Sequence, residues 1–240
     1  ALEAAENPVD YLRGWGWGRF SKIDEEYTHW MEEQRAWRES CAFMDLSYHM
    51  ADFEISGPDA VELLSKYSVN DYSEFDVGKA KQLVVPNPDG YFIGDGILFH
   101  LTEGEFLAVG PAAGLNWLAY QADTGDYDVT YELRGRPVST RTDPKYFRYQ
   151  VQGPDALSVV QDIADAPLPE TGFFNFDELA IDGNPVNALR HGMAGEPGYE
   201  LFGPYDDGDA VADVSFFSVE SGVFVSSELD IFNHLTLDST

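Results

Sequence analysis

The sequence predicts an α+β fold built from two related modules. Two stretches share almost one pattern, "FEISGPDAVELL" at 53–64 and "YQVQGPDALSVV" at 149–160. Each passes from alternating apolar residues through Gly-Pro-Asp-Ala into a helical run, which predicts a strand, a tight turn and a helix. Around them, short alternating runs separated by turn residues predict antiparallel strands. Duplication of one building plan explains the repeat; the alternative is that this joint is favourable and recurs by chance.

The first half of the chain alternates between predicted helices and strands. Residues 25–43 have apolar side chains at helical spacing, with acidic residues early and Arg residues later, and predict an amphipathic helix that includes Cys41. The next elements follow in order: a strand at 51–56, a helix at 60–67, strands at 80–86, 91–101 and 105–110, a helix at 111–122 and a strand at 127–133. The turn residues "PNPDG" (86–90) separate two of these strands.

A polar segment, "RGRPVSTRTDPK" (134–145), separates this half from the second. The second repeated stretch comes next, followed by a predicted hairpin around Asp182-Gly183. The segment "GYELFGPYDDGDAVADV" (198–214) predicts a last strand and the start of a helix.

The charge composition excludes some partners. The 240 residues include 43 Asp and Glu against 14 Lys and Arg, a net charge of −29. Such a surface repels phosphate backbones and anionic lipids, so neither a nucleic acid nor a membrane is an expected partner. No signal-peptide pattern and no apolar run of about 18 residues is found. The scattered acids favour a cytoplasmic protein of a salt-loving organism; the alternative is an ordinary acidic protein.

Cysteine and histidine usage argues against a metal site. Cys41 is the single cysteine, so it cannot form an internal disulfide, and it is expected to be a buried, inert thiol. The five His residues lack the spacing to acidic residues that metal sites require. We therefore predict no metal.

Many short motifs occur in the order typical of one family. They include "DLSYHM" (45–50), the two "GPDA" joints, "VND" (69–71), "GKAKQ" (78–82), "GYFIGDG" (90–96) and "RHGMAGEPGYELFGPYDDG" (190–208). Over about residues 7–213 the sequence resembles the tetrahydrofolate-dependent aminomethyltransferase family, which includes the glycine-cleavage T-protein, and most closely its O-demethylase (vanillate- and syringate-type) branch. The resemblance implies two ferredoxin-like modules, one inserted in the other, with tetrahydrofolate in a central channel. We expect the C-terminal β-barrel domain of the family to be lacking.

The resemblance also implies domain boundaries. Residues 1–46 together with 142–213 form a discontinuous folate-binding module, 47–141 form the inserted α+β module, and 214–240 are a divergent tail. We expect the region that should bring a pterin-side Arg and a catalytic Tyr to be missing, through a truncation or a shifted reading frame.

Two residues are implied to be catalytic. Asp95 matches the family's functional Asp, whose carboxylate lies near the reactive nitrogens of the folate, where it can orient the pterin and manage protons. An Asp between two glycines is otherwise a turn former. His49 matches a His that faces the methyl-donor pocket; the alternative is a satisfied core histidine.

A larger set is implied to bind the cofactor. Glu200 matches the Glu that accepts hydrogen bonds from the amino group and ring N–H of the pterin; the alternative is a solvated charge at a strand edge. The other candidates fall where the family lines the pterin pocket, with apolar core as the alternative for the hydrophobic ones: Arg190, Met193, Phe173, Phe174, Val109, Gly110, Gln152 and Gln82. Val109 and Gly110 would approach the pterin through backbone groups.

The implied function is methyl transfer from a small-molecule donor to tetrahydrofolate. The alternatives are the aminomethyltransferase reaction of glycine cleavage and a truncated, non-catalytic folate-fold protein. Pro111 stands where vanillate-type members carry the Arg that holds an aromatic carboxylate, so a neutral or cationic donor is expected. The oligomeric state is left open.

Overall fold

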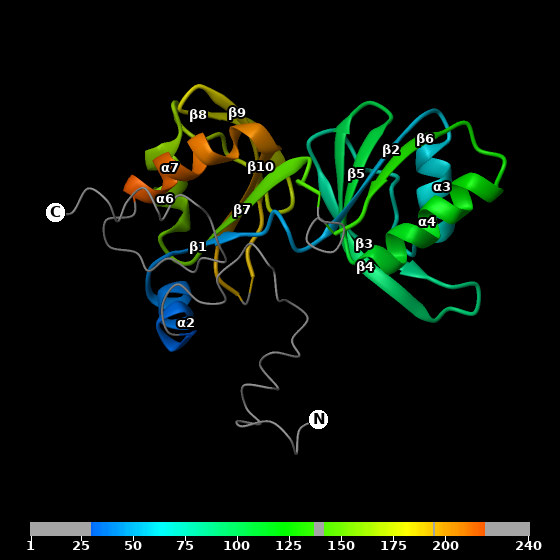
Figure 1. Cartoon of the computed structure of the whole chain (residues 1–240), viewed down its shortest axis with the longest axis horizontal. Helices are drawn as coiled ribbons and strands as arrows, with labels where there is room; N and C mark the ends of the chain where they lie inside the picture. The colour runs from blue at the N-terminus through cyan, green and yellow to red at the C-terminus, as the bar shows by residue number, and fades with distance from the viewer. Residues whose placement is uncertain (1–29, 137–141, 194, 219–240) are drawn as a thin grey trace, which may run out of the picture.

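The computed structural model describes residues 30–136, 142–193 and 195–218, and in these ranges it contains two five-stranded antiparallel sheets (Figure 1). Sheet A has the strand order β1-β7-β10-β9-β8, and sheet B has the order β3-β4-β5-β2-β6. Sheet A consists of β1 (Ala42–Asp45), β7 (Tyr146–Gln152), β8 (Phe176–Ile181), β9 (Asn184–Arg190) and β10 (Gly198–Pro204). Sheet B consists of β2 (Ala51–Ser56), β3 (Ala80–Pro86), β4 (Phe92–Thr102), β5 (Glu105–Gly110) and β6 (Thr130–Arg134).

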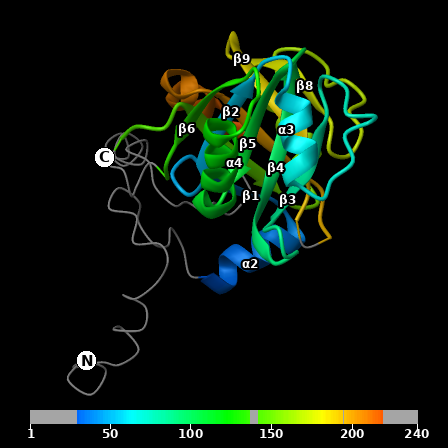
Figure 2. The ribbon, with the colours of Figure 1, turned by 90° about the vertical axis from the view of Figure 1, so that its right-hand side faces the viewer.

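Helices cover the outer face of each sheet, as Figures 1 and 2 show. Sheet A carries α6 (Ala156–Ile163) and α7 (Gly208–Ser218), which follows a short 3-10 turn, η2 (Tyr205–Asp207). Sheet B carries α3 (Ala60–Tyr67) and α4 (Ala112–Thr124). The remaining helix, α2 (Trp30–Glu39), precedes β1. The predicted α+β class is confirmed, with two antiparallel sheets.

The two repeated stretches have the same backbone conformation. Gly57 has φ 132° and Gly153 has φ 131°, and an added Cβ at these positions would lie 2.4 Å from the Asp128 carbonyl oxygen and 2.5 Å from the Ser40 carbonyl oxygen. Only glycine fits such a turn. In each stretch the helix begins at the Ala of Gly-Pro-Asp-Ala. The predicted strand–turn–helix joint is therefore present twice.

The outer cores follow from side-chain periodicity. Helix α3 buries Ala60, Leu63 and Leu64, and helix α6 buries the corresponding Ala156, Val159 and Val160. Under each helix, alternate residues of the preceding strand are also buried, because successive strand side chains point to opposite faces. Each sheet thus has its own helix-covered core.

The helix-free faces of the two sheets pack against each other. The ring of Phe99 in β4 lies 4.8 Å from the ring of Phe202 in β10, and 5.8 Å from that of Phe176 in β8. Backbone hydrogen bonds join the sheets next to this apolar contact, including Ala80 N–H to the Phe174 carbonyl (2.7 Å) and Phe176 N–H to the Gly78 carbonyl (2.8 Å). The inter-sheet space is therefore a core and not open solvent at this end.

The structure corrects the first predicted helix. It ends at Glu39, and β1 begins at Ala42, so Cys41 lies between a helix and a strand rather than on a helix. The apolar residues at 42 and 43 fit helical spacing equally well, which hid the strand. Cys41 is buried, as predicted, and burial raises its pKa from 9.0 to about 12. The part of the predicted helix before residue 30 lies outside the described residues.

Most other elements agree with the sequence. The predicted hairpin is present at Asp182 and Gly183, both with positive φ (48° and 75°). The strand predicted at 127–133 begins only at Thr130. Helix α7 continues to Ser218, so the start of the predicted divergent tail is helical, and 219–240 lie outside the described residues. The division of the chain into domains stays a prediction.

Candidate functional site

Glu200 is buried between the two sheets. It lies in the middle of β10 with 6% of its surface exposed, and in the strand register it is opposite Gln150 of β7 and Leu189 of β9. Burial raises the pKa of its carboxyl group; Arg148 opposes this and Asp52 adds to it. Among the described residues, no side chain donates a hydrogen bond to this carboxyl group. Glu200 is therefore no solvated strand-edge charge.

Gln150 presents a second unsatisfied acceptor beside Glu200. Its side chain is fully buried, and its Nε2 donates to Gln152 Oε1 (3.1 Å) and to the His191 carbonyl (3.2 Å). Its Oε1 has no hydrogen-bond partner within the described part of the chain. Two buried acceptors on neighbouring strands thus lack donors, and buried acceptors are normally paired.

Arg148 lies at the centre of the buried charges. Its guanidinium forms an ion pair with Asp52 of β2, 3.0 Å between Nη1 and Oδ1, and both side chains are only 3% exposed. The pair joins sheet A to sheet B. Burial raises the pKa of Asp52 and Arg148 opposes this.

His49 and Asp45 lie near the same cation. His49 is in the loop between β1 and β2, and its Nδ1 is buried with no hydrogen-bond partner among the described residues. Burial, followed by the positive charge of Arg148, lowers its pKa, so the neutral ring is favoured. Burial raises the pKa of Asp45 to about 6, although Ser47 N–H donates to its Oδ1 (2.8 Å).

Asp95 occupies a different environment. It lies in β4, exposed, on the face of sheet B that also carries Ile97 and Phe99 and that packs against sheet A. Gln82 of β3 donates to its Oδ2 (2.7 Å). Asp95 is therefore held in a strand and is not a turn residue. The structure brings Gln82 and Asp95 together, and it places Asp95 and Glu200 on sheet faces that oppose each other.

Val109 and Gly110 lie on β5 beside this acid. Val109 is 8% exposed and packs in the inter-sheet core. A Cβ at Gly110 would lie 2.7 Å from the Asp95 carbonyl oxygen, so glycine is needed for the close approach of β4 and β5. In the β2–β5 register Val109 is opposite Asp52, which places the buried ion pair next to this part of the sheet.

Gln152 and Met193 have a structural contact with each other. The buried Gln152 amide donates to the carbonyls of Met193 (3.2 Å), Glu196 (2.9 Å) and Pro197 (3.0 Å), and its Oε1 accepts from Met193 N–H (3.1 Å). This amide fixes the turn before β10. Its hydrogen-bonding groups are used within the chain.

Arg190 and Phe173 line a hollow on the other side of sheet A. Arg190 is opposite Tyr199, whose side chain belongs to the helix-covered core, whereas Glu200 faces the other sheet. The guanidinium lies over the Tyr199 ring, 5.5 Å from its centroid. The hollow has a volume of about 510 Å³, and Phe173 on its wall is 70% exposed. The structure does not bring Arg190 and Phe173 together with Glu200.

Phe174 faces the inter-sheet core instead. It adopts φ 59°, which is uncommon for a residue other than glycine. Its ring packs against His191 (5.3 Å between centroids), and its backbone N–H donates to the Arg190 carbonyl (2.8 Å). Phe174 thus lies on the same side of sheet A as Glu200.

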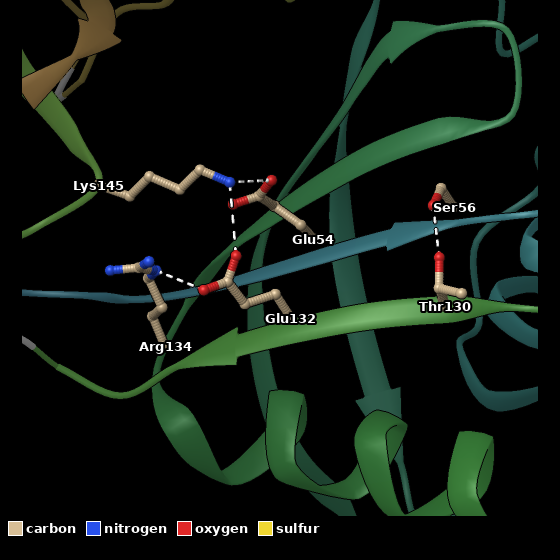
Figure 3. Close-up of polar contacts among 6 residues, drawn as sticks. All are labelled: Glu54, Ser56, Thr130, Glu132, Arg134 and Lys145. Atoms are coloured by element: carbon tan, nitrogen blue, oxygen red, sulfur yellow. Dashed lines mark hydrogen bonds and ion pairs between the residues drawn. The ribbon is translucent and has the colours of Figure 1, made fainter.

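A second ion pair links the two sheets at the surface. Lys145, which precedes β7, contacts Glu54 of β2 (2.6 Å) and Glu132 of β6 (3.5 Å), as Figure 3 shows. Its side chain is 36% exposed and that of Glu54 is 26% exposed. Glu54 is two residues beyond Asp52, on the same face of β2. This strand therefore presents two acids to two basic residues, Arg148 in β7 and Lys145 just before it.

Sequence reasoning missed Arg148, Asp52 and Gln150. In both strands polar residues alternate with apolar ones, a pattern that normally marks a solvated face. The available signal was the repeat itself: Asp52 and Arg148 each stand five residues before the glycine of their unit, and they have opposite charges. Among the residues that the structure describes, no group of three or more His, Cys, Asp or Glu could hold a metal ion, and no helix is long and apolar enough to cross a membrane.

Comparison with known families identifies the chain. Residues 3–216 match the family described as the GCVT N-terminal domain. The chain belongs to this family. It is 42% identical over 214 residues to the syringate O-demethylase of Sphingobium sp., a match that covers 88% of this chain and 46% of that protein. It is 32% identical over 190 residues to a probable aminomethyltransferase of Haloarcula marismortui, covering 75% and 49%.

Solved structures show the same fold for this GCVT-family chain. The glycine cleavage system aminomethyltransferase T of Bartonella henselae matches with a TM-score of 0.64 at 23% identity, covering 83% of this chain and 51% of that one. The heterotetrameric sarcosine oxidase of Corynebacterium sp. U-96 matches with a TM-score of 0.52 at 15% identity, covering 74% and 83%. The chain spans about half the length of the curated relatives it matches.

Proposed function

We propose that this chain takes part in tetrahydrofolate-dependent one-carbon transfer, with methyl transfer from an O-demethylase-type donor as the main reaction. The carrying observation is the pair of buried acceptors, the Glu200 carboxyl group and Gln150 Oε1, side by side between the sheets without donors from the described chain. The similarity to a syringate O-demethylase supports methyl transfer over the alternatives.

The residues present fit tetrahydrofolate. Its pterin carries an amino group and ring N–H groups, which are the donors that a buried carboxylate and an amide oxygen lack. A hydrogen bond to a charged acceptor contributes about 1.5–3 kcal/mol, enough to orient a ring. Phe174 and His191 supply flat surfaces on the same side of sheet A.

The carboxylates of Glu200 and Asp95 would have different roles in the reaction. Tetrahydrofolate, when bound, supplies the nucleophilic N5 that accepts the methyl group. Glu200 would hold the pterin through its N–H groups, and Asp95, fixed by Gln82, would orient the reacting edge and hold a nearby proton. His49, kept neutral beside Arg148, would face the methyl donor.

Calorimetric titration with tetrahydrofolate tests binding. The measurement compares wild type, Glu200→Ala and, as a control on an exposed strand position, Glu178→Ala, all in molar salt. We expect Glu200→Ala to weaken binding by about tenfold or more and Glu178→Ala to have no effect. No binding by the wild type, or equal binding by all three proteins, would refute the role of Glu200.

A methyl-transfer assay tests the reaction. Syringate, neutral methoxyarenes and methylated ammonium or sulfonium compounds are incubated with the protein and tetrahydrofolate, and methyltetrahydrofolate is measured. Because Pro111 stands where an Arg clamp is expected, we propose that neutral or cationic donors react better than syringate. The full-length coding unit, with any downstream region, should be assayed in parallel.

Aminomethyl transfer is the second candidate reaction. The similarity to aminomethyltransferases of 30–33% identity over about half their length favours it. Formation of methylenetetrahydrofolate from an aminomethylated carrier protein, with no methyltetrahydrofolate from any donor, would select this reaction. Folate binding without either product would select the non-catalytic alternative.

The surroundings and organisation of the protein are also proposals. The net charge of −29 supports a cytoplasmic protein working at high salt, with a small methyl donor and without nucleic-acid partners. The strand composition of the two sheets supports a folate-binding module from 1–46 and 142–213 with 47–141 inserted.

A further inference from the structure

Arg148 faces carboxyl groups from both sheets. Asp52 of sheet B contacts its guanidinium directly at 3.0 Å. Glu200 is a diagonal neighbour of Arg148 on the same face of sheet A, because the β7–β10 register pairs Arg148 with Phe202 and Gln150 with Glu200. Such diagonal neighbours lie within reach of long side chains. Arg148 therefore lies near two buried acids, Asp52 of sheet B and Glu200 of sheet A.

In this cluster the burial of Glu200 and Asp52 disfavours their ionised forms, and Arg148 opposes this effect. Arg148 is the cation that acts on Glu200, and Asp52 is the anion that acts on it. Burial lowers the pKa of His191, which follows β9, so the neutral ring is favoured. Asp45 and His49 also feel the charge of Arg148. The ionisation of Glu200 thus depends on how strongly Asp52 neutralises the positive charge of Arg148.

We propose that Arg148 is a positioning residue for Glu200. Anchored by Asp52 on the opposite sheet, its guanidinium favours the ionised form of the Glu200 carboxyl group and directs it into the space between the sheets. Ligand binding at Glu200 then depends on the packing of sheet A against sheet B. The part that concerns a ligand rests on the proposed folate-binding function; the electrostatic part does not.

The two members of the ion pair have opposite effects on Glu200. Without the Arg148 charge, the ionised form of Glu200 loses the cation that stabilises it, and its pKa rises further. Without the Asp52 charge, a repelling anion is gone and Arg148 is free to serve Glu200, so the pKa falls. A purely structural pair would give both substitutions the same effect, through loosened packing.

Carboxyl-carbon NMR of glutamate-labelled protein, free of ligand, measures this directly. Glu200→Gln identifies the Glu200 signal. We expect the titration midpoint to move to higher pH in Arg148→Met and to lower pH in Asp52→Asn, and to stay near the wild-type value in Arg148→Lys. Lys145→Met, which removes the other inter-sheet ion pair, is the matched control and leaves the midpoint unchanged.

A fallback variant keeps the test decisive if Arg148→Met does not fold. The doubly neutral Arg148→Met/Asp52→Asn protein has no unpaired charge, and its midpoint must lie above that of Asp52→Asn alone. Midpoints that shift in one direction in both single variants, or that do not move, overturn the proposal.

Tetrahydrofolate titrations of the same proteins separate the two proposals. We expect Arg148→Met to bind about tenfold more weakly near neutral pH and to regain affinity as the pH is raised, because only the ionised acid accepts both hydrogen bonds. If the wild type binds no tetrahydrofolate while the midpoints move as expected, the proposed function fails and the positioning role stands. If the wild type binds and the midpoints do not move, the positioning role fails alone.

Discussion

Asp52 and Arg148 occupy equivalent positions in the two repeated strand–turn–helix units, and their side chains form a buried ion pair 3.0 Å long across the two sheets. The same sequence position carries an acid in one unit and a base in the other. The repeat therefore produces the contact that joins its two copies. The two repeated units meet through complementary charges.

Breaking this pair should cost much more stability than breaking its surface counterpart. Either Arg148→Met or Asp52→Asn leaves one buried charge without its ion-pair partner and should lower the free energy of unfolding by about 3–5 kcal/mol. The double variant should recover most of that loss. Lys145→Met, at a pair whose side chains are 36% and 26% exposed, should cost less than about 1 kcal/mol. Urea unfolding measures all four; equal losses at the buried and exposed pairs would contradict the expectation.

Replacement of either turn glycine by alanine should destabilise the fold. Gly57→Ala and Gly153→Ala place a Cβ within 2.4–2.5 Å of a backbone carbonyl oxygen at φ near 131°, so each should destabilise the fold by about 3 kcal/mol or more. Gly90→Ala is the control, since it also has positive φ (84°) but nothing within 4 Å, and it should cost about 1 kcal/mol. Chemical denaturation compares the three.

The Cys41 thiol should make the native state less stable in alkali. Its pKa is about 12 in the folded protein against a reference of 9.0. The native state therefore retains a proton that the unfolded chain releases, so the free energy of unfolding falls as the pH rises above 9.0, by about 1.4 kcal/mol per unit. The difference between wild type and Cys41→Ala, measured from pH 8 to 10.5, isolates this contribution; a parallel pH dependence of the two proteins would rule it out.

Added salt should raise the melting temperature. At a net charge of −29 the folded chain repels itself, and screening lengths fall to roughly 10 Å at 0.1 M and 3 Å at 1 M salt. Thermal unfolding between 0.05 and 0.5 M KCl covers the range in which screening dominates. Sucrose at matched osmolality is the control for general exclusion effects. A melting temperature that stays flat or falls with KCl would contradict the prediction.

Removing the Gln152 amide should loosen the turn before β10. Gln152→Ala removes the side-chain donor of three backbone carbonyls and the acceptor of Met193 N–H. The carbonyls of Met193 and Pro197 keep a backbone N–H donor, and the substitution should cost about 2–3 kcal/mol. Gln82→Ala removes an exposed amide and should be nearly neutral for stability. Hydrogen exchange of Met193 N–H gives a local measurement, and unchanged protection there would contradict the role of Gln152.

Local patterns predicted most of the secondary structure because its determinants are local. Alternating residues predicted the strand at 80–86 and the first Gly-Pro-Asp joint predicted the helix at 60–67, at the boundaries found. The second joint predicted a helix within 149–160, and the structure has it at Ala156–Ile163. The strand at Ala42–Asp45 was missed because four apolar-rich residues after a helix carry no period of their own. Its partner, β7, lies about a hundred positions later, and pairing over such a distance leaves no local trace.

The candidate site was predicted less completely than the fold. Residue types and the family resemblance pointed to Glu200 and Asp95, and the structure places them on facing sheets. What the sequence could not show is which face of a strand a second sheet will cover. Polar residues that alternate with apolar ones are typical of a solvated face, but Arg148 and Gln150 are buried.

The antiparallel pairing of β1 with β7 has a consequence for folding kinetics. Asp45 pairs with Tyr149, and the Leu46 N–H donates to the Arg148 carbonyl (2.7 Å), so the chain leaves for sheet B and returns from it at adjacent points. Pairing of β1 with β7 brings together two segments separated by the residues that form sheet B. If those residues were still unfolded, the pairing would carry the large closure entropy of a long loop. We therefore expect sheet B to fold first and to hold β1 and β7 close together, so that sheet A can then form.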